Sequence, residues 1–172
     1  AHHNTPVLGL EPSAILTFRD EYKRLSSDSE TTEAIALNAF LIEEFISREI
    51  QKGEIGPSQF TKVAKQVKIH NHCHQKALSN QKVTFDMLNL PENYTVSIIS
   101  SGCCGMAGSF GYEKEHYGLS MAIGELKLFP SIRKTSEDVL IAANGTSCRH
   151  QIMDGTGRKA QHPISIFKEA ML

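Results

Sequence analysis

The sequence has no tryptophan, no long apolar run and no excess of either charge sign. Its 172 residues include 18 Lys and Arg against 19 Asp and Glu, which gives a net charge of −1. No basic block is longer than a pair, so a nucleic-acid partner is not expected. The longest apolar runs, such as residues 139–143, are far shorter than the roughly 20 residues of a membrane span. We therefore expect no membrane span.

Signals for export and for disorder are also missing. The polar start at residues 1–4 is unlike a secretory signal peptide, so none is expected. A composition of 40% hydrophobic residues, 12 Gly and 6 Pro excludes collagen-like and disordered chains. At about 150 residues per domain, the length predicts one domain over residues 1–172.

Hydrophobic periodicity predicts alternating strands and helices. Apolar runs predict strands at 67–72, 95–100 and 139–143, and a further short apolar run covers residues 7–10. Helical spacing is most regular over residues 32–51. Further helices are expected at 13–22, 74–89, 112–128, 146–154 and 163–171. The alternation predicts an α/β fold, in which a mostly parallel, Rossmann-like sheet is flanked by helices.

All four cysteines follow predicted strands. Cys73 comes after the strand at 67–72, Cys103 and Cys104 after the strand at 95–100, and Cys148 after the strand at 139–143. The carboxyl ends of parallel strands share one edge of a sheet, where sites collect. Filling of the core, the usual role of a free cysteine, predicts positions inside elements instead. Adjacent cysteines rarely bridge each other, so metal or redox chemistry is the favoured interpretation.

Glycines surround the cysteine pair. Gly102, Gly105 and Gly108 let the backbone turn sharply and approach a bulky inorganic group, so we expect them to help bind a cofactor. A phosphate-binding loop is the alternative, but neither of its glycine patterns is present.

Histidines near Cys73 leave a zinc site open as a rival. His70, His72 and His74 alternate around Cys73, but no second cysteine pair accompanies them. A strand continuing this far would place the three histidines on one face and Cys73 on the other. Structural histidines, hydrogen-bonded near the site, are the simpler interpretation. Lys76 lies near the same edge, as does Arg149, and either would offset negative charge there or be solvated.

Three segments together resemble a known family. Residues 72–78, 102–113 and 144–152 resemble the cysteine-rich CCG domain. That domain occurs in heterodisulfide reductase, in the iron–sulfur subunits of glycolate and lactate oxidases, and at the C-terminus of FAD-linked oxidases. Residues 9–13 and 16–21 are most similar to the last group.

The resemblance implies an electron-transfer module of an FAD-linked 2-hydroxyacid oxidoreductase. By this resemblance, Cys73, Cys103, Cys104 and Cys148 hold a [4Fe–4S] cluster. FAD belongs to another domain of the parent protein, which oxidises a 2-hydroxy acid such as D-lactate or 2-hydroxyglutarate. The expected partners are this flavin domain and ferredoxin-like domains, in the cytoplasm or at the inner face of the membrane. The chain alone is then expected to turn over no substrate.

The chain departs from the family pattern at two positions. Ala14 stands where the family usually has another cysteine, and Gln151 stands where many members complete a C-x-x-C. If Ala14 replaces a thiolate, its Cβ should point at the site; otherwise position 14 faces the core. Two other functions stay open: a zinc-stabilised structural or interaction domain, and a redox-thiol or disulfide-reducing site at Cys103 and Cys104.

Overall fold

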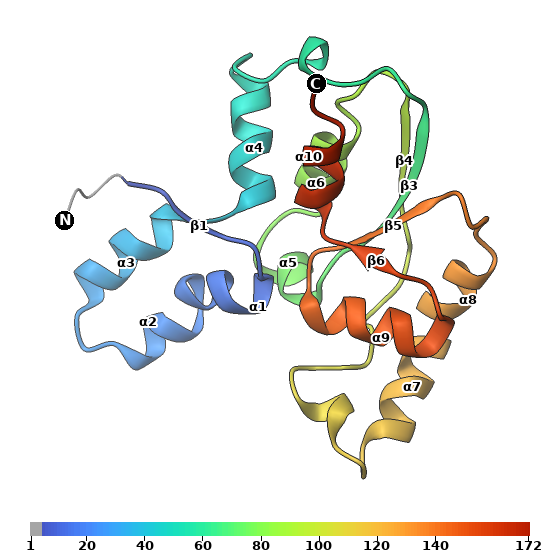
Figure 1. Cartoon of the computed structure of the whole chain (residues 1–172). Helices are drawn as coiled ribbons and strands as arrows, with labels where there is room; N and C mark the ends of the chain where they lie inside the picture. Colours follow the sequence, from blue (N-terminus) through green and yellow to red (C-terminus); the bar gives the residue numbers. More distant parts are fainter. Residues whose placement is uncertain (1–4) are drawn as a thin grey trace.

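A computed structural model describes residues 5–172 and shows an α/β fold with two separate sheets, both entirely parallel (Figure 1). The polar start at 1–4, where no signal peptide is expected, lies outside the described residues. The larger sheet has the strand order β4-β3-β5-β6. Its strands are β3 (Lys65–His70), β4 (Tyr94–Ile98), β5 (Leu140–Ala143) and β6 (Ala160–Gln161). The predicted parallel architecture is confirmed.

Helices cover both faces of this sheet. On one face lie α4 (Ile42–Gln51), α6 (Lys82–Leu88) and α10 (Pro163–Glu169). On the other lie α7 (Tyr117–Glu125), α8 (Leu128–Arg133) and α9 (Thr146–Thr156). Strand β5 serves both layers, because Ala142 packs with the first group and Ile141 with the second. Such two-sided burial explains why the strand is apolar throughout.

The smaller sheet belongs to an N-terminal lobe. It pairs β1 (Val7–Gly9) with β2 (Ala39–Leu41), and between them lie α1 (Pro12–Ile15), a 3₁₀ turn at 16–19, α2 (Glu21–Leu25) and α3 (Ser29–Asn38). Arg19 joins this lobe to the rest of the molecule. Its guanidinium donates to the carbonyl oxygens of Ala39 and Leu78 and forms an ion pair with Glu44.

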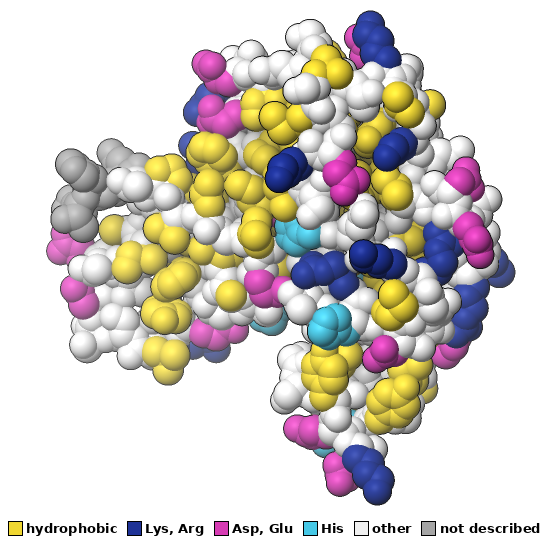
Figure 2. All heavy atoms as spheres, viewed as in Figure 1, with side chains coloured by type: hydrophobic (Ala, Val, Ile, Leu, Met, Phe, Trp, Pro, Cys, Tyr) yellow, Lys and Arg dark blue, Asp and Glu magenta, His cyan; other side chains and the backbone are white. Residues whose placement is uncertain are grey.

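Hydrophobic side chains gather on the outside of this lobe (Figure 2). The exposed members are Val7, Leu8, Leu10, Tyr22, Leu25, Ile35 and Leu37. Within residues 5–172, no helix is both long and apolar enough to cross a membrane.

The single helix expected over 32–51 is wrong. Residues 39–41 form strand β2 between α3 and α4, because Ala39 and Leu41 are fully buried and pair with β1. Pairing with a segment some 30 residues away overrides local helix preference here.

Other predicted boundaries also change. The helix expected at 13–22 is broken into α1, the 3₁₀ turn and α2, and the one expected at 74–89 ends at Leu78 and restarts at Lys82. The helix expected at 112–128 begins only at Tyr117, and the sequence pattern predicts neither α8 nor β6. The three strands predicted at 67–72, 95–100 and 139–143 are confirmed within a few residues as β3, β4 and β5.

Candidate metal centre

The thiols meet where the order of the sheet reverses. The chain runs from β3 outward to β4 and then returns past β3 to β5, so a crevice opens at the carboxyl ends of β3 and β5. Cys73 is the first residue of α5 (Cys73–Leu78), which follows β3. Cys148 is the third residue of α9, and the Cys103–Cys104 pair lies in the loop after β4.

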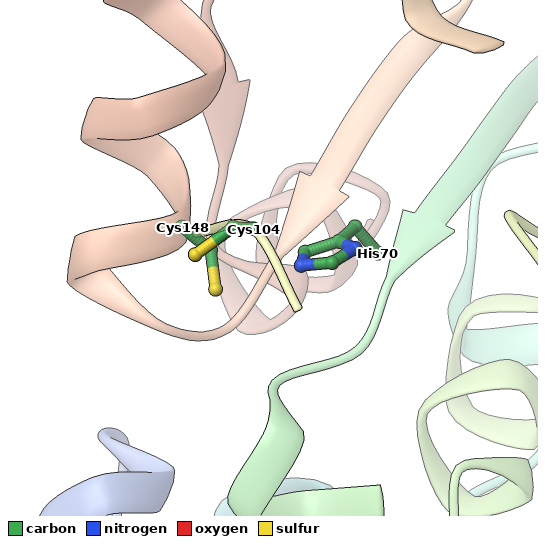
Figure 3. Close-up of side chains that lie close together, drawn as sticks. All are labelled: His70, Cys104 and Cys148. Atoms are coloured by element: carbon green, nitrogen blue, oxygen red, sulfur yellow. The ribbon is translucent and has the colours of Figure 1, made fainter. Parts of the chain in front are cut away.

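Two of these thiols lie beside a histidine in the buried part of the crevice. The ligand atoms of His70, Cys104 and Cys148 all lie within 4.8 Å of one another (Figure 3). Cys103 joins this group to the surface, because its sulfur interacts with the thiols of both Cys104 and the exposed Cys73. All four cysteines are free thiols. The structure therefore brings the four predicted cysteines together.

The pKa values of the four thiols are shifted in alternating directions by their neighbours. The pKa of Cys73 is raised, first by its hydrogen bond with Cys103 and then by burial. The pKa of Cys103 is lowered by hydrogen bonds from Cys104 and Cys73. Hydrogen bonds with Cys103 and Cys148 raise the pKa of Cys104, and that of Cys148 is lowered by Cys104 and by His70. The four side chains are thus close enough to perturb one another's protonation.

His70 is held in a fixed orientation at the end of β3. Its Nδ1 lies 2.9 Å from the Ser101 hydroxyl oxygen, and the ring is directed toward Cys104 and Cys148. The sequence predicts a structural histidine here. In the structure, a ring nitrogen of His70 also lies within 4.8 Å of the sulfurs of Cys104 and Cys148.

The other two histidines lie on the first turn of α5. His72 is the N-cap of α5, where its Nδ1 accepts a hydrogen bond from the His74 backbone N–H at 3.1 Å. Burial lowers the pKa of His72. The ligand atoms of His72, Cys73 and His74 also lie within 4.8 Å of one another. The strand does not continue through Cys73, because β3 ends at His70 and a helix begins at Cys73, so the division of these residues between two strand faces does not arise.

The three predicted cofactor glycines differ in their surroundings. Gly105 has φ +102°, and a Cβ there would lie 2.1 Å from the Ser120 carbonyl oxygen, so it is required for packing against α7. Its N–H donates to the Cys103 sulfur at 3.3 Å. Gly108 has open space and lines the cavity beside the thiols, and Gly102 has open space as well.

Two basic side chains hold the loops that carry the cysteines. The Lys76 ammonium donates to the carbonyl oxygens of Ser101 and Gly102, at 2.7 and 2.9 Å. Arg149 donates to the carbonyl oxygens of Ala143 and Asn144, at 3.0 and 2.8 Å. Lys76 therefore fixes the backbone just before Cys103, and Arg149 fixes the turn between β5 and α9. Both also carry positive charge.

A cavity opens from the thiols to solvent. It is lined by Glu11, Ser13, His72, Cys73, His74, Cys103, Cys104, Ala107, Gly108, Tyr112, Thr146 and Ser147. Ala14 is exposed beside the lining residue Ser13, so a core-facing position for Ala14 is wrong. Gln151 is buried and donates to the Ser120 backbone and hydroxyl oxygens, so it ties α9 to α7.

Two polar residues lie in segments that carry the family resemblance, but the sequence alone assigns neither of them a role in the site. The Asn144 side chain accepts from the His72 backbone N–H and donates to Gln75, which joins β5 to the start of α5. Glu11 accepts from the Thr146 N–H at 2.7 Å, across 135 residues of sequence. Only the folding of the N-terminal lobe onto α9 brings this pair together.

Comparison with known proteins relates the chain to oxidoreductases. It is 27% identical over 167 residues to a subunit of the anaerobic glycerol-3-phosphate dehydrogenase of Escherichia coli K12, a match covering 96% of this chain and 40% of that protein. It is also 27% identical to the D-2-hydroxyglutarate dehydrogenases of Pantoea ananatis and E. coli K12, covering 95% of this chain and 15% of each relative. No family model and no solved structure matches the chain.

The donor set fits a metal cofactor of the iron–sulfur kind. Four thiols from three segments converge on one crevice, and thiolates are the ligands that iron–sulfur clusters prefer. The N–H of Gly105 supplies one hydrogen bond to a sulfur, an interaction that tunes such centres. The chain is thus a cysteine-rich α/β unit whose donor atoms fit a metal, and it is similar to parts of larger dehydrogenases.

Proposed function

We propose that the chain is a CCG domain that holds a [4Fe–4S] cluster and relays electrons within an FAD-linked 2-hydroxyacid oxidoreductase. The observation that carries this proposal is the convergence of Cys73, Cys103, Cys104 and Cys148 at the switch point of the sheet. Four thiolates are the number that a [4Fe–4S] cubane requires. When bound, the cluster supplies reversible one-electron transfer.

The residues of the chain determine where the cluster lies and how easily it is reduced. Cys104 and Cys148 are buried while Cys73 is exposed, so one side of the centre faces the protein core and the other faces the cavity. Lys76 holds the loop before Cys103 and supplies positive charge. Gly105 donates its N–H to a ligand sulfur. No side chain is needed as a general acid or base.

The proposed partners are a flavin domain and ferredoxin-like domains of a larger protein. The D-2-hydroxyglutarate dehydrogenases that match the chain are much longer than it is, since the chain spans 15% of their length. Exposed apolar side chains on the N-terminal lobe supply a surface for such contacts. The family resemblance also supports a cytoplasmic site of action, free or peripheral at the inner face of the membrane.

Anaerobic reconstitution tests the proposal. The chain is incubated with ferrous iron and sulfide under reducing conditions, desalted, and analysed for iron, sulfide and visible absorbance. We expect about four irons per chain and a broad brown absorbance that dithionite bleaches. Cys148→Ser should remove most of this absorbance, whereas Ser147→Ala, one residue away, should retain it.

Other results would favour the two alternatives. Colourless protein that binds one zinc per chain would indicate a zinc-stabilised structural domain. Colourless, metal-free protein whose thiols reduce a disulfide substrate would indicate a redox-thiol site at Cys103 and Cys104. Either result would contradict the electron-transfer proposal.

A further inference from the structure

The helix that carries Cys148 begins without a cap of its own. The first residue of α9 is Thr146, and its N-cap position is Gly145, which has no side chain to accept a hydrogen bond. Any larger residue is excluded there, because a Cβ at Gly145 would lie 2.3 Å from Cδ2 of the His72 ring. Unpaired N–H groups in a first helical turn are normally satisfied by a neighbouring oxygen. For α9 that oxygen comes from elsewhere in the chain.

Glu11 provides the missing cap from the N-terminal lobe. One of its carboxylate oxygens accepts from the Thr146 N–H at 2.7 Å. The other oxygen accepts from the Ser13 hydroxyl at 2.9 Å and from the Ser13 N–H at 3.4 Å. The second of these hydrogen bonds caps the N-terminus of α1. A single carboxylate therefore serves the N-termini of two helices that lie in different parts of the fold. Losing it would free the start of α9 from the N-terminal lobe.

The same carboxylate is close to the thiols. Glu11 and Thr146 both line the cavity that exposes Cys73 and Cys103, and Cys148 lies two residues after Thr146. Its charge also acts on the neighbouring His72 ring. A fixed negative charge beside an iron–sulfur centre opposes the addition of an electron, and charge is one of the factors that set the potential.

We propose that Glu11 is a positioning residue for the metal centre, which fixes the first turn of α9 and thereby Cys148, and whose charge lowers the reduction potential. This inference rests on the proposed function for its second part only. The first part concerns the metal-free protein as well, because the hydrogen bond from Thr146 involves no metal.

Two substitutions separate the hydrogen bond from the charge. Glu11→Gln retains an oxygen that can accept from Thr146 but carries no charge, whereas Glu11→Ala removes both. Asp28→Ala is the matched control, because Asp28 caps α3 by accepting from the Thr31 N–H at 3.0 Å. All three changes thus involve a carboxylate at a helix start, but the Asp28 side chain is not among those lining the thiol cavity.

Hydrogen exchange of the metal-free protein tests the cap. In Glu11→Ala, the Thr146 amide should exchange about fivefold faster than in the unsubstituted chain, the effect of losing one typical cap. In Glu11→Gln it should stay near the original rate, and in Asp28→Ala only the Thr31 amide should change. Equal Thr146 exchange in all four proteins would overturn the positioning role.

Redox titration of the reconstituted protein tests the charge. Glu11→Gln should shift the midpoint potential to a more positive value, with iron content unchanged, while Asp28→Ala should leave the potential where it is. Identical potentials for Glu11→Gln and the unsubstituted chain would overturn the electrostatic role. An unsubstituted chain that takes up no iron would overturn the proposed function and this electrostatic role together, and the exchange data would still decide the cap.

Discussion

The Lys76 ammonium donates a hydrogen bond to the Ser101 carbonyl oxygen at 2.7 Å, so the first helix after β3 is tied to the loop after β4. We expect Lys76→Met to release this loop and to lower the free energy of unfolding by about 1.5–3 kcal/mol, a range typical of hydrogen bonds to charged groups. Urea unfolding of the metal-free protein measures the change. Lys82→Met is the control, since Lys82 pairs with Asp86 on the exposed side of α6.

The opposite pKa shifts of Cys73 and Cys103 predict an order of cysteine reactivity that differs from the order of solvent exposure. Cys73 is the most exposed of the four cysteines, but its raised pKa keeps it protonated at neutral pH. Cys103 is partly buried and has a lowered pKa. Because the thiolate is the reactive form, iodoacetamide at pH 7 should modify Cys103 before Cys73 in metal-free protein. Mass spectrometry of timed samples gives the order.

A substitution tests the cause of this order. The largest effect on the pKa of Cys73 is its hydrogen bond with the Cys103 sulfur. In Cys103→Ser that sulfur is gone, so alkylation of Cys73 should become faster at pH 7 to 8. If Cys73 is already the first residue modified in the unsubstituted chain, the opposite pKa shifts of Cys73 and Cys103 are wrong.

The buried Glu43 carboxyl should make the protein less stable as the pH rises from 4.5 to about 7. The side chain is fully buried, and neither of its oxygens has a hydrogen-bond partner among residues 5–172. Burial raises the pKa of Glu43 from 4.5 to about 7. The unfolded chain therefore releases this proton at lower pH than the folded chain, and stability falls between pH 4.5 and 7. The loss is about 3 kcal/mol, because each pKa unit corresponds to about 1.4 kcal/mol.

Comparison with Glu43→Gln isolates this effect. The variant cannot ionise at this position, so its stability relative to the unsubstituted chain should increase from pH 4.5 to 7 and then level off. Burial also lowers the pKa values of His72 and His162, which reduces the stability of both proteins at low pH. The His162 Nε2 lies 4.0 Å from the Glu43 Oε1. Denaturant unfolding at pH 5 and pH 8 gives the difference. A constant difference, as expected for the exposed Glu92→Gln control, would contradict the prediction.

Alanine substitutions at Gly105 and Gly102, which flank the Cys103–Cys104 pair, should differ in their effects on stability. Gly105 has a left-handed backbone and faces the Ser120 carbonyl oxygen, so Gly105→Ala should cost about 3 kcal/mol of stability and reduce iron incorporation. A Cβ at Gly102 would have no atom within 4 Å, and Gly102→Ala should change stability by less than about 1 kcal/mol. Thermal unfolding of both variants measures the contrast. Similar losses would mean that the loop packs differently against α7.

Local sequence patterns are enough to predict the main sheet and the position of the thiols. Strand β5 is recognisable because it is apolar on both sides, and Cys148 follows it after a short turn. The parallel arrangement then places this residue at the same edge as Cys73, which follows the neighbouring strand β3. Each step needs only the nearby sequence and the general geometry of parallel sheets.

Contacts between distant segments are not predictable in the same way. Ala39 and Leu41 fit a helical pattern as well as a strand, and only pairing with β1 decides between the two. The bond between Glu11 and Thr146 likewise depends on how the N-terminal lobe packs. The sequence also does not show which glycines are needed for packing. A Cβ at Gly105 would clash with α7, whereas a Cβ at Gly108 would meet no neighbour.

Cys148 follows the other three cysteines in the sequence, so it is the last of the four to be synthesised. Strands β3 and β4 are made before this thiol and before the amide that binds Glu11. Until then Cys73, Cys103 and Cys104 lie in an incomplete crevice, because β5 has not yet entered the sheet beside β3. Contacts between such distant segments form late and slowly during folding. A four-thiol centre can therefore assemble only after β5 and α9 have been made, and the three earlier thiols must stay reduced until then.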